Sequence, residues 1–242
     1  MNKAAANRYC ELDLLRTISI AMMIAYHIAY DLESYYGWHI GLFVYAGWHL
    51  LQLSTATFFL LLAGCSFAIS WSRTPIYRKY LKRGMGVVAC GMLVTAATYW
   101  FEPATYVRFG ILHMIGVSII LLPFFTRLDE WNLPAGLFIA GLGMFMPAVS
   151  GGTLALVPFG MTPPGFATVD YFPLIPWFGV VLIGYAIGLR IYVKRSPPLF
   201  SILHSSFFIR ITWPGRHALI IYLLHQPVLL GILVALGAIG LF

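Results

Sequence analysis

Long apolar runs recur along the whole chain and constrain its fold more than any other feature. A helix needs about 20 mostly apolar residues to cross a bilayer, and seven stretches approach or exceed that length. They cover residues 13–34, 46–71, 84–101, 110–125, 131–149, 171–191 and 216–241. Only 10% of the residues are charged, against about 25% in a soluble domain. The sequence therefore predicts one all-α domain over residues 1–242, a polytopic membrane bundle of about seven transmembrane helices.

The distribution of basic residues predicts the orientation of this bundle. Fourteen of the fifteen lysines and arginines lie in the N-terminal tail, in segments 72–83, 126–130 and 192–215, or at the adjoining helix ends. Arg108 is the exception. Positive charge collects on the cytoplasmic side of membrane proteins, so we expect a multi-pass cell-membrane protein with a cytoplasmic N-terminus and an external C-terminus. The net charge of +7 is then a topology signal, and no nucleic-acid partner is expected.

Two loops are long enough to carry structure of their own. The external loop 150–170 is rich in Gly and Pro, and either a re-entrant lid over a site or an ordinary surface loop fits it. The segment 201–213 is too short to span and is expected to be an interfacial amphipathic helix. If it did span, the C-terminus would be cytoplasmic.

Small residues in the apolar runs predict close helix packing. Gly184 and Gly188 form a G-x-x-x-G pattern, which lets two helix backbones approach. Cys10, Cys65 and Cys90 form no C-x-x-C pair, and we expect reduced packing residues.

The first apolar run contains ionisable residues, which are costly in hydrocarbon and are candidates for function. Arg16 lies near the predicted cytoplasmic end, and His27 lies eleven residues further along. Asp31 is at i+4 from His27, on the same helix face. A carboxylate beside an imidazole suits a general base, whereas a buried ion pair that orients helices is an equally simple explanation.

Further polar residues are predicted at the external side of the membrane. Arg108 and His113 open the fourth run, Asp170 precedes the sixth, and His39 lies in the first external loop. Together with the His27–Asp31 pair they could line one outward-facing cavity. For any single histidine of this kind, a satisfied core position is the simpler interpretation.

The cytoplasmic side carries a second group of polar residues. A basic cluster consists of Arg78, Lys79, Lys82 and Arg83, and the last run begins at Arg216 and contains His225. This group either determines topology alone or binds a polyanionic cytosolic cofactor, because Arg and Lys bind phosphates well.

Four segments together resemble a known membrane family. They are "ELDLLRTISIAMMIAYHIAYDL", "VRFGILHMIG", "DYFPLIPWFGVVLIGYAIG" and "GRHALIIYLLHQP", in that order along nearly the whole chain. They are similar to the family that contains the catalytic domain of heparan-alpha-glucosaminide N-acetyltransferase, many prokaryotic members of which carry only a domain-of-unknown-function label. Arg16 and His27 also have the spacing typical of the acyltransferase-3 membrane enzymes.

The resemblance implies transfer of an acetyl or other acyl group from cytosolic acyl-CoA to an external sugar amine or hydroxyl. His27 would then be the base or the acyl relay, and Asp31 would orient it. His113, also a catalytic residue, and Arg108 would position the acceptor or stabilise the oxyanion. Arg108, Asp170 and His39 would bind the acceptor. In the lysosomal enzyme the catalytic histidine follows the first span, a position nearer His39 than His27 here. The larger relatives in this family have ten or eleven transmembrane spans, more than the seven predicted here.

The resemblance also implies where the acyl donor binds. Arg16, Arg216, His225 and the basic cluster would hold CoA. The expected partners are the lipid bilayer, acyl-CoA and a sugar or glycan acceptor, with a homo-oligomer left open. No metal is expected.

Three other functions fit some of these residues. A proton-coupled transporter or flippase could use the same His and Asp side chains as a relay, although seven short-looped spans without repeats suit alternating access poorly. A haem carrier would need two histidines at matched depth on facing helices, and haem is not expected. A purely structural membrane module would not need so many polar groups.

Overall fold

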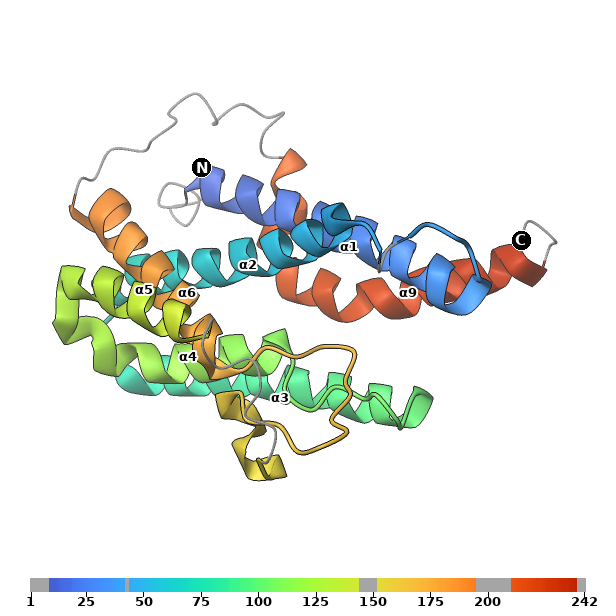
Figure 1. Cartoon of the computed structure of the whole chain (residues 1–242). Helices are drawn as coiled ribbons and strands as arrows, with labels where there is room; N and C mark the ends of the chain where they lie inside the picture. The colour runs from blue at the N-terminus through green and yellow to red at the C-terminus, as the bar shows by residue number, and fades with distance from the viewer. Residues whose placement is uncertain (1–8, 42–43, 144–151, 195–209, 239–242) are drawn as a thin grey trace. The chain divides into compact units, whose positions relative to one another are not determined.

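The computed structural model describes residues 9–41, 44–143, 152–194 and 210–238. All regular elements in these ranges are helices, which confirms the all-α prediction, and one isolated parallel bridge pairs Phe109 with Tyr171. The helices in chain order are α1 (Cys10–Tyr36), α2 (Ala46–Arg73), α3 (Tyr77–Phe101), α4 (Ile111–Phe125), η1 (Thr126–Trp131), α5 (Asn132–Leu142), η2 (Leu154–Phe159), α6 (Leu174–Gly188), η3 (Leu189–Lys194), α8 (Trp213–Arg216) and α9 (Ala218–Ala238) (Figure 1). Residues 201–209 of the expected interfacial helix lie outside the described residues.

Six helical stretches in the described residues are long and apolar enough to cross a membrane, one fewer than the sequence predicted. The difference arises between residues 111 and 142, where α4, η1 and α5 follow one another without a gap and form one stretch of 32 residues. Asp129 interrupts this stretch with φ 50° and ψ −121°. The expected fifth run, 131–149, is described only as the 11-residue α5, and residues 144–149 lie outside the described part.

The chain divides into two compact units. The first consists of residues 1–59 and 198–242, and the second of residues 60–197. The boundary falls within α2, so the second unit begins at Leu60 on that helix.

Glycines join α6 to the part of α2 that belongs to the second unit. A Cβ at Gly184 would lie 2.2 Å from the carbonyl oxygen of Leu61, and one at Gly188 would lie 2.6 Å from the Cα of Cys65. The backbones therefore touch at both positions, which confirms the packing role predicted for this G-x-x-x-G pair. Residue numbers rise in the same direction along both helices, from Leu61 to Cys65 on α2 and from Gly184 to Gly188 on α6. The two helices therefore run parallel.

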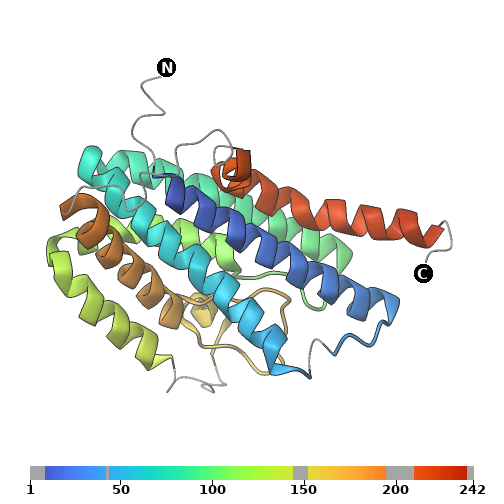
Figure 2. The ribbon, with the colours of Figure 1, turned by 90° about the horizontal axis from the view of Figure 1, so that it is seen from above.

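The other helix pairs of the second unit run antiparallel. On α3 and α4, Gly84 faces Gly116 and Gly91 faces His113. On α5 and α6, Gly136 faces Gly179 and Gly143 faces Pro176. Figures 1 and 2 show α5 and α6 side by side.

The direction of each helix determines which loops share an end of the second unit. The ring of Tyr77 at the start of α3 lies 5.5 Å from that of Phe124 at the end of α4. Lys194 of η3 pairs with Asp129 and Glu130 of η1 at 2.8 and 3.0 Å. The segments around residues 73–83, 126–130 and 190–194, predicted to be cytoplasmic, therefore lie at one end of this unit.

In the first unit, α9 packs against α1 and runs parallel to it. Gly215 contacts Asp13 near the start of α1, while Gly237 lies against the ring of Tyr36 at its end. The starts of α1 and α9 therefore lie at the same end of this unit.

Candidate functional site

The imidazoles of His27 and His225 meet in the contact between α1 and α9. Their ring centroids lie 4.7 Å apart with an interplanar angle of 82°. The sequence placed His225 nearer the cytoplasmic end and His27 nearer the external end. The structure brings both to one level, because α9 runs parallel to α1 and begins beyond α8.

Backbone carbonyls orient both rings. Nδ1 of His27 lies 2.9 Å from the carbonyl oxygen of Met23, and Nδ1 of His225 lies 2.5 Å from that of Tyr222. A carbonyl only accepts hydrogen bonds, so each Nδ1 carries the proton and donates it. The lone pair of each neutral ring then lies on Nε2. Both residues thus present a basic nitrogen without the help of a carboxylate.

Asp31 is fully buried and bonds to α9, one residue beyond His225. Its Oδ1 accepts a hydrogen bond of 2.6 Å from Nε2 of Gln226. Asp31 was expected to orient His27, but that orientation comes from Met23. The carboxylate remains within one helical turn of the imidazole, on the same face of α1.

Three buried polar atoms of this site have no hydrogen-bond partner among the described residues. They are Oδ2 of Asp31, Oε1 of Gln226 and Nε2 of His225. Buried polar atoms are nearly always satisfied, and unsatisfied ones cost free energy. We call His27, Asp31, His225 and Gln226 the His–Asp site. Each of these three atoms is a hydrogen-bond acceptor.

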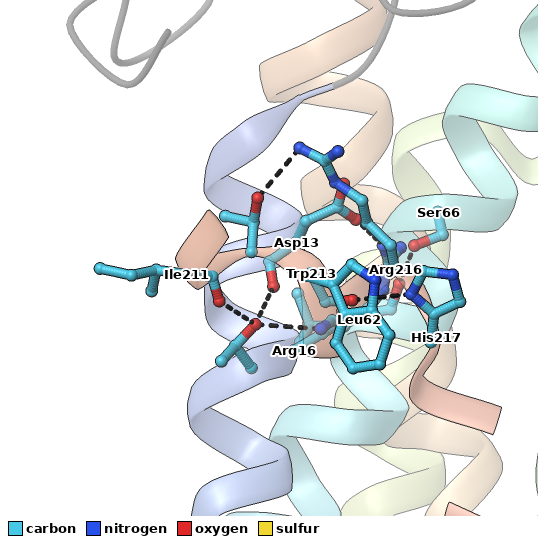
Figure 3. A network of polar contacts seen from close by, with 11 residues as sticks. Asp13, Arg16, Leu62, Ser66, Ile211, Trp213, Arg216 and His217 are labelled. Atoms are coloured by element: carbon cyan, nitrogen blue, oxygen red, sulfur yellow. Dashed lines mark hydrogen bonds and ion pairs between the residues drawn. The ribbon is translucent and has the colours of Figure 1, made fainter. Parts of the chain in front are cut away.

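A second polar network lies toward the start of α1. The carboxylate of Asp13 contacts the guanidinium of Arg16, three residues along the helix, and lies 3.7 Å from Nε of Arg216 on α8 (Figure 3). Asp13 is buried, with 5% of its surface exposed. Two guanidinium groups thus lie beside one carboxylate. The two arginines expected to bind CoA are thus brought together.

Thr17 attaches α8 to α1 beside this network. Its hydroxyl accepts the backbone N–H of Gly215 at 3.0 Å and lies 3.2 Å from the carbonyl oxygen of Ile211. A Cβ at Gly215 would lie only 1.9 Å from the carbonyl oxygen of Asp13, so the close approach requires glycine. These contacts place Arg216 over Asp13.

His113 of the second unit is buried between α3 and α4. Its Nδ1 accepts the backbone N–H of Gly110 at 3.3 Å, and its Nε2 lies 3.5 Å from the hydroxyl of Thr95. The ring also packs on Gly91, where a Cβ would lie 3.0 Å away. This geometry gives His113 a structural role at the start of α4. A catalytic role for it stays a prediction.

Asp170 lies beside the same helix end. Its Oδ2 accepts the backbone N–H of Ile111, the first residue of α4, at 3.1 Å. A negative charge at a helix N-terminus is favourable. Burial nevertheless raises the pKa of Asp170 to about 6, although the Ile111 N–H opposes the shift. A Cβ at Gly110 would lie 2.1 Å from Oδ2.

The described part of the 150–170 loop is bonded to the connection between α3 and α4. Val169 donates its N–H to the carbonyl of Thr105 at 2.8 Å, and Phe172 donates to that of Phe109 at 3.0 Å. Arg108 donates to the carbonyl of Ala167 at 3.1 Å. Its guanidinium carbon lies 4.6 and 4.9 Å from the ring centroids of Tyr106 and Phe166, respectively. Arg108 therefore holds this loop in place.

The remaining predicted site residues are exposed. Arg78, Lys79, Lys82 and Arg83 lie on the first turns of α3, and His39 lies in the loop after α1. Within the described residues, no three His, Cys, Asp or Glu side chains gather as a metal site would require.

Sequence reasoning missed two residues of these networks. Asp13 was overlooked because it lies in the first turn of a helix, where an acidic residue is common. Gln226 is uncharged and therefore lies outside the set of ionisable residues from which the candidates came. A glutamine within a membrane-spanning run was the available signal, because its amide needs a partner there.

Comparison with known families gives one match that covers residues 8–227. The matched family is described as "Heparan-alpha-glucosaminide N-acetyltransferase, catalytic". No curated protein and no solved structure matched the chain. The match includes both networks of the first unit as far as Pro227, and all of the second unit. The chain therefore belongs to the heparan-alpha-glucosaminide N-acetyltransferase catalytic family of membrane acetyltransferases.

Proposed function

We propose that this protein transfers an acyl group, typically acetyl, from cytosolic acyl-CoA to a sugar amine or hydroxyl on the external side of the membrane. One observation carries the proposal beyond family membership. It is the His–Asp site, in which Asp31 is buried and Met23 fixes the tautomer of His27 so that Nε2 can accept a proton.

The proposed reaction is a direct transfer. Nε2 of His27 takes the proton of the acceptor N–H or O–H as the acceptor atom attacks the thioester carbonyl. The new bond to the acyl carbon forms, the C–S bond breaks, and the CoA thiolate recovers the proton from His27. The negative charge of Asp31, one turn away, stabilises the imidazolium that exists between these steps.

Two groups of residues are assigned to the substrates in this proposal. The two guanidinium groups of Arg16 and Arg216, which lie together beside Asp13, support binding of CoA phosphates at the cytoplasmic end. The basic cluster on α3 is the second candidate for these phosphates. Arg108, Asp170 and His39 are assigned to the acceptor side.

The test measures donor binding and transfer separately in detergent-purified protein. Acetyl-CoA binding is followed by calorimetry, and transfer of labelled acetyl to glucosamine by chromatography, for wild type, His27→Gln and Arg216→Ala. Loss of a general base slows a reaction by about 10²- to 10⁴-fold. We expect that loss in His27→Gln with donor binding intact, and weakened donor binding in Arg216→Ala.

His49 supplies a matched control, since it is exposed at the start of α2 and has no assigned role. His49→Gln should bind and transfer as wild type does. Folded wild-type protein that binds no acyl-CoA would refute the proposal and favour a proton-coupled transporter built on the same His and Asp residues.

A further inference from the structure

The buried carboxylate of Asp31 depends on a neutral residue of another helix. Asp31 has no exposed surface, and its one described hydrogen bond comes from the amide of Gln226 at 2.6 Å. A carboxylate without water needs such donors, because burying an uncompensated charge is costly. Hydrogen bonds to charged groups are also stronger than those between neutral groups.

The position of Gln226 links both α1 side chains to one turn of α9. His225 contacts the ring of His27, and the next residue along the chain bonds Asp31. His27 and Asp31 are themselves one turn apart on α1. The neighbouring residues of α9 therefore hold the base and the carboxylate in a fixed relation to each other.

The residue type at position 226 also fits this task. A glutamate there would bring a second carboxylate within 2.6 Å of Asp31, and two such groups cannot both be ionised at that distance. An apolar residue would leave both oxygens of Asp31 without a donor. An amide supplies an N–H and adds no charge.

We propose that Gln226 is a positioning residue of the acyl transfer, which holds the Asp31 carboxylate at a fixed orientation beside His27 through its side-chain N–H. This inference rests on the proposed function for its effect on rate. The hydrogen bond itself is tested independently of activity.

The experiment compares wild type with Gln226→Met, which keeps the length of the side chain and removes the N–H. In lipid nanodiscs, the infrared band of the Asp31 carboxyl group is identified by its loss in Asp31→Asn. We expect this band to shift in Gln226→Met. We also expect kcat for acetyl transfer to fall about 10- to 100-fold with little change in KM for acetyl-CoA, as loss of a hydrogen bond to a charged group implies.

Gln52 is the matched control, because it is the other glutamine of the chain and is exposed on α2. Gln52→Met should leave the band and both kinetic constants unchanged. Should Gln226→Met fail to fold, Gln226→Asn keeps an amide that is one methylene too short to bridge to Asp31, and it should show the same shift and loss.

The outcomes separate this inference from the proposed function. An unshifted Asp31 band, or an unchanged kcat in a folded Gln226 variant of an active enzyme, would overturn the positioning role. If wild type has no transferase activity although the band shifts, the proposed function fails and the catalytic consequence falls with it, while the hydrogen bond stands.

Discussion

Replacing Gly184 by alanine should separate α6 from α2 within the second unit. The added Cβ would lie 2.2 Å from the carbonyl oxygen of Leu61 and 2.7 Å from its Cα. Ordinary contacts begin near 3.4 Å, so the backbones must move apart by about 1 Å. A gap of that size forfeits about a quarter to a half of the dispersion energy at each contact.

The shift would also disturb neighbouring contacts. Cys65 donates its thiol proton to the carbonyl of Gly184 at 3.0 Å, and Gly64 faces Val181 with equal closeness. Overpacking of this kind costs about 1–3 kcal/mol. Alanine regains up to about 1 kcal/mol of helix propensity, so the free energy of unfolding should fall by about 1–2 kcal/mol.

Titration of detergent-solubilised protein with SDS, followed by circular dichroism, measures this change. Gly86→Ala on α3 is the control, because nothing lies within 4 Å of its Cβ position, and it should be as stable as wild type or slightly more so. Equal stability of Gly184→Ala and Gly86→Ala would refute the inference that backbone contact at Gly184 joins these helices.

Two further predictions concern the ends of the units. Because burial raises the pKa of Asp170 to about 6 from an ordinary value of 3.8, the unfolded chain loses this proton first as pH rises. The stabilisation that the protonated Asp170 carboxyl gives to the folded state is complete below about pH 4 and is lost by about pH 6. The free energy of unfolding should therefore fall by at most about 3 kcal/mol across this window. Denaturant titrations at several pH values in this window should show this fall. If Asp170→Asn shows the same fall, a group other than Asp170 causes it. Thr17→Val should lower the free energy of unfolding by about 1–2 kcal/mol, because it leaves the N–H of Gly215 unpaired. Thr17→Ser keeps the hydroxyl and should be as stable as wild type. Equal free energies of unfolding for the two variants would contradict the role of the hydroxyl.

The helical fold could be predicted from the sequence because apolar length alone dictates it. Without water in the bilayer core, a backbone must satisfy its own hydrogen bonds, so long apolar runs become helices. The contact at Gly184 and Gly188 was also predictable, since small residues four apart are a local pattern. The break between α4 and α5 was predictable as well, since the charged segment 126–130 separates two apolar runs, whereas the positive φ of Asp129 leaves no trace in hydropathy.

The site was predictable only where its residues are close in sequence. His27 and Asp31 share one helix face, so spacing alone pairs them. Gln226 on α9 lies 195 residues away from Asp31 along the chain, and no local pattern reports such a contact. Residue counting along the predicted spans placed His225 and His27 at different depths in the membrane. In the structure a separate one-turn helix, α8, precedes α9, so α9 begins later than the sequence predicted.

The two imidazoles illustrate how a helix can prepare a base without a charged partner. Within the preceding turn, a backbone carbonyl accepts the Nδ1 proton of each ring and so leaves Nε2 basic. The carboxylate of Asp31 is therefore not needed to choose the tautomer of His27. Its charge can instead act when the imidazole becomes protonated, and that effect depends on a fixed orientation. A side chain whose only task is orientation should be neutral, which is the chemistry that Gln226 provides.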